Sequence, residues 1–367
     1  MGFNCGIVGL PNVGKSTIFN ALTAAGAEVA NYPFCTIDPN IGIVVVPDPR
    51  LEALARILSP PKVTPTTMEF VDIAGLVTGA SRGEGLGNKF LGHLREVDAL
   101  IHIIRCFQNP DVVHVVGAVD PLRDREVVNT ELILADLDTV ERRLEKTERL
   151  AKVGDKGARK ATLFLTRLRD VLGRGLPARS LIPDEEHGED EALRREMHLL
   201  TDKPVLYVAN VSESMLKAPS PPVEALEQAA AQEGSLVVTI CGDMEAEIAE
   251  LPPEERRGFL DDMGLAEPGL AKLIRAGYDL LNLITFYTTV GPELRAWTIP
   301  RGTPAHQAAG RIHTDMERGF IRAEILHYDD FLAAGGIAPA REKGLLRSEG
   351  KSYRMMDGDI ALFRFNV

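Results

Sequence analysis

The sequence predicts an α/β fold, in which a domain of parallel strands and helices contains a helical insertion and precedes a small α+β domain. Short apolar runs alternate with helical patterns between residues 4 and 240, an apolar seam with steps of four and three begins at Glu131, and strand-like segments return beyond Ile284. We expect the first domain over residues 1–280, its insertion at about 130–200, and the second domain over 283–366.

The composition is typical of a protein from a reducing cytoplasm. The chain has 367 residues and four cysteines, with no C-x-x-C pair. No apolar stretch is long enough to span a membrane, and the phosphate-loop strand starts too early to leave room for a cleaved signal. A net charge of −12 argues against a surface that binds nucleic acid all over, but leaves a local basic patch open. The sequence therefore predicts a cytoplasmic protein without membrane contact.

The segment Gly9–Ser16 reads GLPNVGKS and fits the phosphate-loop pattern G-x-x-x-x-G-K-[ST]. An apolar run at 4–8 predicts a buried strand before it, and residues 17–25 have helical spacing after it. Phosphates would then lie at the positive end of a helix. The alternative is a glycine-rich turn without a ligand. We expect phosphate and metal contacts from Asn12, Val13, Gly14, Lys15, Ser16 and Thr17, with the Lys15 ammonium at the β/γ oxygens and the Ser16 hydroxyl on Mg²⁺.

Asp72 directly follows a second strand-like run at 67–71 and begins the sequence Asp72-Ile73-Ala74-Gly75. An aspartate at this place in a phosphate-loop protein holds Mg²⁺, usually through water. Gly75 would let its backbone N–H approach the γ-phosphate closely. The alternative is an ordinary Asp-Gly turn.

Two polar segments are candidate switch loops. The first, residues 31–40, is punctuated by proline and brings Thr36 as a further candidate Mg²⁺ ligand, although an exposed threonine on a surface turn is the alternative. The second, residues 76–87, contains four glycines and is expected to become ordered when a nucleotide or partner contacts it.

The helical insertion is predicted to be two antiparallel helices that form a short coiled coil. Its apolar seam breaks at residues 154–157 and continues through Leu165, Leu168 and Leu172. Between Glu141 and Arg179 there are twelve Lys or Arg residues against five acids, a net charge of +7. This stretch is either an arm that contacts RNA phosphates or a solvated helical face with charge pairs four residues apart.

Beyond Ile284 the pattern predicts two strands, a helix near 304–312 and a closing hairpin that turns at residues 357–359. Three histidines of this region lack metal-ligand spacing and are interpreted as surface or packing residues: His306, His313 and His327. His102, within the strand-like run 99–106, is interpreted in the same way.

These segments together resemble the YchF subfamily of Obg-like P-loop nucleotidases. The resemblance covers essentially the whole chain and is carried by GLPNVGKS, PFCTIDPN, DIAGLVTGAS, NVSE and RAWTIPRGTPAHQAAGRIHTDMERGFIRAE. It implies a Ras-like nucleotide-binding domain of the Obg type, a coiled-coil insertion and a C-terminal TGS domain of the β-grasp type. It also implies association with the ribosome, through the basic arm and the TGS domain, and hydrolysis of nucleotide, often with ATP preferred to GTP.

The sequence departs from ordinary GTPases where the base is bound. The guanine-binding pattern N-K-x-D is replaced by Asn210, Val211, Ser212 and Glu213, so the lysine that stacks over the base is missing and the acid is one methylene longer. An Asn side chain can pair with the N6/N7 edge of adenine. Base contacts are therefore expected from Asn210, Val211 and Glu213, with ATP favoured and GTP left open.

A second departure is Leu76, which stands where Ras-like enzymes carry the glutamine that orients the attacking water. Leucine cannot hydrogen-bond that water, so intrinsic hydrolysis should be slow. The resemblance offers two substitutes, a K⁺ ion seated by Asn12 and His114 on a mobile loop. The predicted catalytic residues are Lys15, Gly75 and His114.

The sequence thus predicts a Mg²⁺-dependent nucleoside triphosphatase that acts as a ribosome-associated switch. The alternatives are a guanine-nucleotide switch in ribosome assembly and a nucleotide-bound scaffold with negligible turnover.

Overall fold

A computed structural model describes residues 3–26, 41–73, 86–115, 117–182, 188–218 and 220–366. The chain forms two compact units. Unit 1 comprises residues 1–44 and 69–273, and unit 2 comprises residues 45–68 and 274–367. Within the described residues, no helix is long and apolar enough to cross a membrane.

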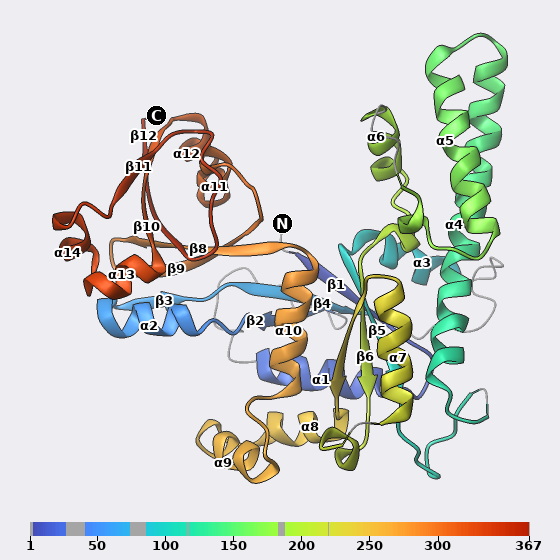
Figure 1. The fold of residues 1–367 in the computed structure, drawn as a ribbon, viewed down its shortest axis with the longest axis horizontal. Coiled ribbons are helices and arrows are strands. Elements are labelled where there is room, and N and C mark those ends of the chain that lie inside the picture. The colour runs from blue at the N-terminus through green and yellow to red at the C-terminus, as the bar shows by residue number, and fades with distance from the viewer. Residues whose placement is uncertain are drawn as a thin grey trace. The chain divides into compact units, whose positions relative to one another are not determined.

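Unit 1 is built on a six-stranded sheet with the order β2-β4-β1-β5-β6-β7 (Figure 1). The pairs β1–β4, β1–β5, β5–β6 and β6–β7 are parallel. The strands are β1 Asn4–Val8, β2 Ile41–Val45, β4 Thr67–Asp72, β5 Ala99–Arg105, β6 Val205–Asn210 and β7 Leu236–Ile240. Every residue of β5 and β6 is buried, which explains why these strands read as continuous apolar runs.

Helices connect these strands in the order that a parallel sheet requires. They are α1 Lys15–Gly26, α3 Leu86–Glu96, α7 Pro221–Gln232, α8 Gly242–Glu250 and α9 Pro253–Met263, with the short helix η5 at Glu213–Leu216. Helix α10, Gly269–Leu280, leads from unit 1 into unit 2.

The predicted helical insertion is a pair of antiparallel helices, which we call the arm (Figure 1). They are α4 Pro121–Lys152 and α5 Lys156–Gly173, followed by η3 Ala178–Ser180, α6 Gly188–Glu196 and η4 Leu200–Asp202. Aspartates cap both helices, since Asp120 accepts from the N–H of Arg123 and Asp155 from that of Ala158. The predicted seam is buried between the helices, including Val140, Leu144, Leu165, Leu168 and Leu172.

Unit 2 contains a mixed six-stranded sheet with the order β11-β10-β12-β8-β9-β3. Its elements are α2 Pro49–Leu58, β3 Lys62–Thr64, β8 Leu283–Val290, β9 Glu293–Pro300, α11 Ala305–Ile312, α12 Thr314–Arg318, β10 Phe320–His327, α13 Tyr328–Ala334, α14 Ile337–Glu342, β11 Arg347–Glu349 and β12 Asp359–Phe365. One face packs on α11 and α12, and the other packs on α2, α13 and α14.

Residues 45–68 lie in unit 2, although the sequence analysis placed them within the first domain. Strand β3 pairs with β9, and Arg50 forms ion pairs with Asp48 and Asp357. The hydroxyl of Tyr287 also donates to Asp48. Contacts far apart in sequence therefore hold this segment in the second sheet. The predicted boundaries at 280 and 283 stay a prediction.

The predicted closing hairpin is wrong. β12 pairs with β10 and β8, and the residues before the turn bond elsewhere: the N–H of Met355 donates to Thr303, and Tyr353 accepts from Ala305. The sequence correctly indicated alternation along the strand, since Ala361 and Phe363 are buried. A two-stranded hairpin would give these side chains no core, whereas pairing with β10 and β8 places them within one.

Candidate nucleotide-binding site

The predicted phosphate loop joins the carboxyl end of β1 to the first residue of α1. This is the edge of a parallel sheet where ligands bind in open α/β folds. Two residues of the loop have positive φ, Asn12 at 62° and Gly14 at 90°. Gly9 packs so closely on β5 that an added Cβ would lie 2.6 Å from the carbonyl oxygen of Ile103. The sequence GLPNVGKS thus forms a tight turn that needs its glycines.

Asn210, at the end of β6, holds this loop in place. Its buried side-chain amide donates to the carbonyl of Val13 at 2.8 Å, and its Oδ1 accepts from the N–H of Gly242 at 3.0 Å. A Cβ on Gly14 would lie 2.2 Å from Nδ2 of Asn210. Asn210 therefore ties the phosphate loop to the first residue of α8. One amide hydrogen and one lone pair are left for the predicted contact with a base.

Lys15 and Asp72 meet at the same edge. Lys15 is the buried first residue of α1, and its ammonium forms an ion pair with the carboxylate of Asp72 at the end of β4. The pairing of Ile7 with Asp72 in the parallel register brings that carboxylate beside the loop. Ser16 is exposed and Thr17 is half-buried on the first turn of α1. The structure thus brings together the lysine, the hydroxyl and the acid of the predicted site.

The residues present fit a nucleotide with Mg²⁺. Within the described residues, no group of three or more His, Cys, Asp or Glu side chains could hold a metal ion by itself. Magnesium commonly binds through one or two carboxylates, water and substrate phosphates. An acid beside the first turn of a helix, with a lysine in between, suits this mode of binding.

A loop after β5 touches the phosphate loop through Asn12. The side-chain amide of Asn12 donates to the carbonyl of Val113 at 3.1 Å. Arg105, the last residue of β5, is buried, and its guanidinium donates to the carbonyls of Phe107, Asn109 and Val112 at 3.0 to 3.2 Å. One guanidinium therefore shapes the loop that contacts Asn12.

His114 lies in that loop but does not point to the phosphate loop by any recorded contact. Its Nε2 lies 2.7 Å from Oδ2 of Asp124, in the first turn of α4, and both side chains are buried. Asp124 also pairs with Arg123 at 3.2 Å. The structure therefore connects the loop beside Asn12 to the first turn of the arm helix.

The predicted base-binding residues follow β6. Val211 is buried and donates from its N–H to the carbonyl of Ile240 at 2.9 Å. Glu213 begins η5 and is exposed, so its carboxylate is accessible to a ligand. Three other predicted site residues, Thr36, Gly75 and Leu76, lie outside the described residues, as do residues 31–40 and 76–85 of the candidate switch loops.

Other titratable groups near these strands are neutral core residues. Burial, with the negative charge of Asp124 as a second cause, raises the pKa of the Cys106 thiol to about 12. Burial, assisted by the positive charge of Arg125, lowers the pKa of His102 to about 3. His102 is thus an uncharged packing residue, as predicted.

Sequence reasoning missed two residues that shape the site, Arg105 and Asp124. The signal for Arg105 was an arginine that ends the apolar strand ALIHIIR. A charge in such a run must find partners when it is buried. Asp124 gave no comparable signal, because acids are common in the first turn of any helix.

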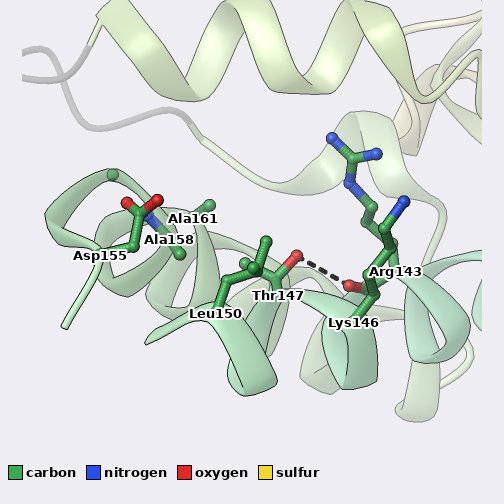
Figure 2. A pocket seen from close by; sticks show the side chains of 8 residues that line it. Arg143, Lys146, Thr147, Leu150, Asp155, Ala158 and Ala161 are labelled. Atoms are coloured by element: carbon green, nitrogen blue, oxygen red, sulfur yellow. Dashed lines mark hydrogen bonds between the residues drawn. The ribbon is translucent and has the colours of Figure 1, made fainter. Parts of the chain in front are cut away.

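The arm carries a groove between its helices near the far end, with a volume of about 420 Å³ (Figure 2). Arg143, Lys146 and Leu150 of α4 line one side, and small residues of α5, Ala158 and Ala161, line the other. Some of the arm's cations are paired with acids. Arg142 pairs with Asp138, and Arg143 pairs with Glu196 at 3.0 Å.

The fold and this site define a P-loop nucleotide-binding protein with a helical arm and a C-terminal α+β unit. A family model described as "50S ribosome-binding GTPase" matches residues 4–134. The YchF-GTPase C-terminal model, described as "Protein of unknown function (DUF933)", matches residues 283–366. The chain is 55% identical to "Ribosome-binding ATPase YchF" of Haemophilus ducreyi and 53% identical to that of Bacillus subtilis, with both chains fully covered. The chain therefore belongs to the YchF family, and the predicted fold class is confirmed.

Two solved structures have the same fold. The YchF GTPase of Schizosaccharomyces pombe matches with a TM-score of 0.88 at 35% identity, covering 99% of this chain and 98% of the other. A GTP binding protein of Pyrococcus horikoshii matches with a TM-score of 0.62 at 21% identity, which supports the fold alone.

Proposed function

We propose that this protein is a Mg²⁺-dependent nucleoside triphosphatase, with ATP favoured over GTP, whose nucleotide state controls its association with the ribosome. The observation that carries the proposal is the contact of Lys15 with Asp72 beside a loop that Asn210 holds in place. The names of the full-length relatives, which call them ribosome-binding ATPases, support the same activity and partner.

In this proposal Lys15 releases Asp72 and stabilises charge on the β- and γ-phosphates. Backbone N–H groups of Val13 to Thr17 at the start of α1 hold phosphate oxygens. Ser16 and Thr36 are the proposed direct ligands of Mg²⁺, and Asp72 holds the ion through water. The bound Mg²⁺ supplies charge neutralisation at the phosphates. Gly75 gives a backbone N–H to the γ-phosphate.

Turnover is proposed to be slow without a stimulator. Leu76 offers no hydrogen bond to the attacking water, and the imidazole of His114 is buried against Asp124. Catalysis by His114 would first require that pair to separate. Asn12 is proposed to help seat K⁺, which requires its amide oxygen, since the amide nitrogen is the atom that contacts Val113. The buried pair also favours a second candidate, a nucleotide-bound scaffold with negligible turnover.

The preference for ATP rests on the residues after β6. Val211 offers no cation to stack on a base, and Glu213 lies on an exposed turn where the guanine clamp would require a shorter aspartate. GTP binding, in a guanine-nucleotide switch of ribosome assembly, remains the rival.

The arm and unit 2 are the proposed contacts with the ribosome. Lys146 and Arg143 border the groove in Figure 2, so RNA phosphates near it would meet positive charge. Because part of this charge is neutralised by acids on the arm, the number of phosphates contacted should be smaller than the net charge of the segment indicates.

The test is phosphate release from ATP by the parent protein and by Lys15→Ala, with ribosomes and K⁺ present. The proposal expects stimulated release by the parent and a loss of about two to three orders of magnitude in the variant, typical of removing a group that stabilises transition-state charge. Equal rates would exclude a catalytic Lys15. Absence of stimulation in the parent would favour the scaffold.

A further inference from the structure

A second cavity lies in unit 1 at the base of the arm, which we call the base cavity. Its volume is about 490 Å³, within the range of small-molecule sites. Leu100 and Val205 in its wall belong to the amino ends of β5 and β6, whereas Asp72 and Asn210 lie at the carboxyl ends of their strands. Five strand residues separate Val205 from Asn210, or about 16 Å. The base cavity is therefore distinct from the phosphate loop.

Arg125, on the first turns of α4, carries the chemistry of this cavity. Its side chain is only 11% exposed, and its Nη2 contacts Glu126 at 2.5 Å and Glu233 at 3.2 Å. Its Nε and Nη1 are buried and have no hydrogen-bond partner among the described residues. Buried guanidinium N–H groups are costly to leave unpaired, so these two nitrogens favour a ligand with acceptor oxygens.

The remaining polar groups of the cavity are fixed in position. Glu233 also accepts from the guanidinium of Arg179 at 2.9 Å and from the hydroxyl of Tyr207 at 3.1 Å. Arg179 donates to the carbonyl of Thr201 at 3.1 Å. The three acceptor sites of Glu233 are thus largely used, and Arg125 keeps the free donors.

A buried carboxylate stiffens the wall opposite Arg125. Asp136 of α4 accepts from the N–H groups of Leu200 and Thr201 at 2.9 and 2.7 Å and from the Thr201 hydroxyl at 2.7 Å. These bonds fasten η4 to the arm helix, and the cavity between them is therefore pre-formed. A rigid wall lowers the ordering cost of binding.

The charges and the apolar floor indicate the class of ligand. Two arginines and two glutamates line the cavity, so its wall has no net charge and a dianion would be repelled by Glu233. The floor is apolar and consists of Leu100, Leu132, Ile133, Leu200 and Val205. We propose that the base cavity binds a small organic carboxylate with an apolar body, whose oxygens accept from Arg125.

The position of the cavity gives such a ligand a structural effect. Its lining comes from α4, from the residues that follow α5, and from η4, which are the places where the arm leaves and rejoins unit 1. A ligand there would join these segments and restrain the base of the arm. This inference does not depend on nucleotide hydrolysis.

The test uses 4-fluorobenzoate as the probe and the full-length protein, with binding followed by fluorine NMR in the presence and absence of ADP. We expect binding that ADP does not displace. Arg125→Lys keeps a positive charge beside Glu233 but removes the Nε and Nη1 donors, and should weaken binding by about tenfold or more, the loss of one charge-assisted hydrogen bond. Arg142→Lys, on the same helix and 77% exposed, is the matched control and should bind as the parent does.

A second comparison in the parent protein is independent of any variant. The neutral isostere 4-fluorobenzamide should bind about tenfold more weakly than the carboxylate. The proposal is overturned if the carboxylate does not bind at about 10 mM, far weaker than a specific site allows. It is also overturned if the amide binds equally well, if Arg125→Lys binds as tightly as the parent, or if inorganic phosphate displaces the probe more strongly than benzoate does.

Discussion

Replacing Asn210 by alanine should loosen the phosphate loop, because this one side chain connects it to α8. The change removes two buried hydrogen bonds, of 2.8 Å to Val13 and 3.0 Å to Gly242, and leaves a carbonyl and an N–H without partners. At about 1–3 kcal/mol for each group left unpaired, we expect a loss of about 3 kcal/mol in the free energy that protects this region from opening.

The assay is amide hydrogen exchange, read by mass spectrometry on peptides from α1 and β6. Peptides from β8 and β9 in unit 2 serve as an internal reference and should be unchanged, since the units have separate cores. Asn20→Ala is the matched control, because Asn20 is exposed on α1 and should change protection by no more than about 0.5 kcal/mol. Unchanged protection in Asn210→Ala, together with unchanged ATP affinity, would refute the reasoning.

Three further predictions concern the arm and the core. Asp124→Asn should weaken the hold on His114 and speed hydrogen exchange in the loop 106–115 and the first turn of α4, and identical exchange would show that this pair does not fix the loop. Raised thiol pKa values of about 12 for Cys5 and Cys106, caused first by burial, mean that the unfolded chain loses these protons earlier, so the unfolding free energy should fall as pH rises from 9 toward 12; a flat profile between Cys→Ala double variant and parent would contradict this. Neutralising the arm's cations should weaken sedimentation with ribosomes and reduce its salt dependence, while equal pelleting at each salt concentration would count against RNA contact by Arg142, Arg143 and Lys146.

Local patterns predicted most of the fold. The strand before the phosphate loop, the helix after it and the two helices of the arm were all readable, because buried parallel strands form apolar runs and coiled coils repeat every seven residues. The capping aspartates Asp120 and Asp155 agree with the same boundaries. Such features depend on residues that are close in sequence.

Features that depend on distant residues were not predicted. The segment 45–68 joins unit 2 through Asp48, Arg50 and Asp357, a pairing across about three hundred residues that no local pattern indicates. The hairpin prediction failed for the same reason, because a turn at 357–359 does not determine which strand β12 pairs with.

The candidate site divides along the same line. Lys15, Ser16 and Asp72 were named from motifs, and the structure brings them to one edge of the sheet. The role of Asn210 as a brace for the loop required the packing of β6 against Gly14, which sequence does not show. Arg105 and Asp124 became visible only once the loop after β5 was placed.

The most direct test of the central claim is a calorimetric titration of the parent and Lys15→Ala with ATP and GTP, each with Mg²⁺. The account predicts that the parent binds both nucleotides no worse than about micromolar for ATP, with ATP tighter than GTP, and that Lys15→Ala loses about tenfold or more in affinity for the lost charge-assisted contact. Equal ATP binding by the variant would contradict a phosphate role for Lys15. GTP bound about a hundredfold tighter than ATP, or about 2.7 kcal/mol, would contradict the ATP preference.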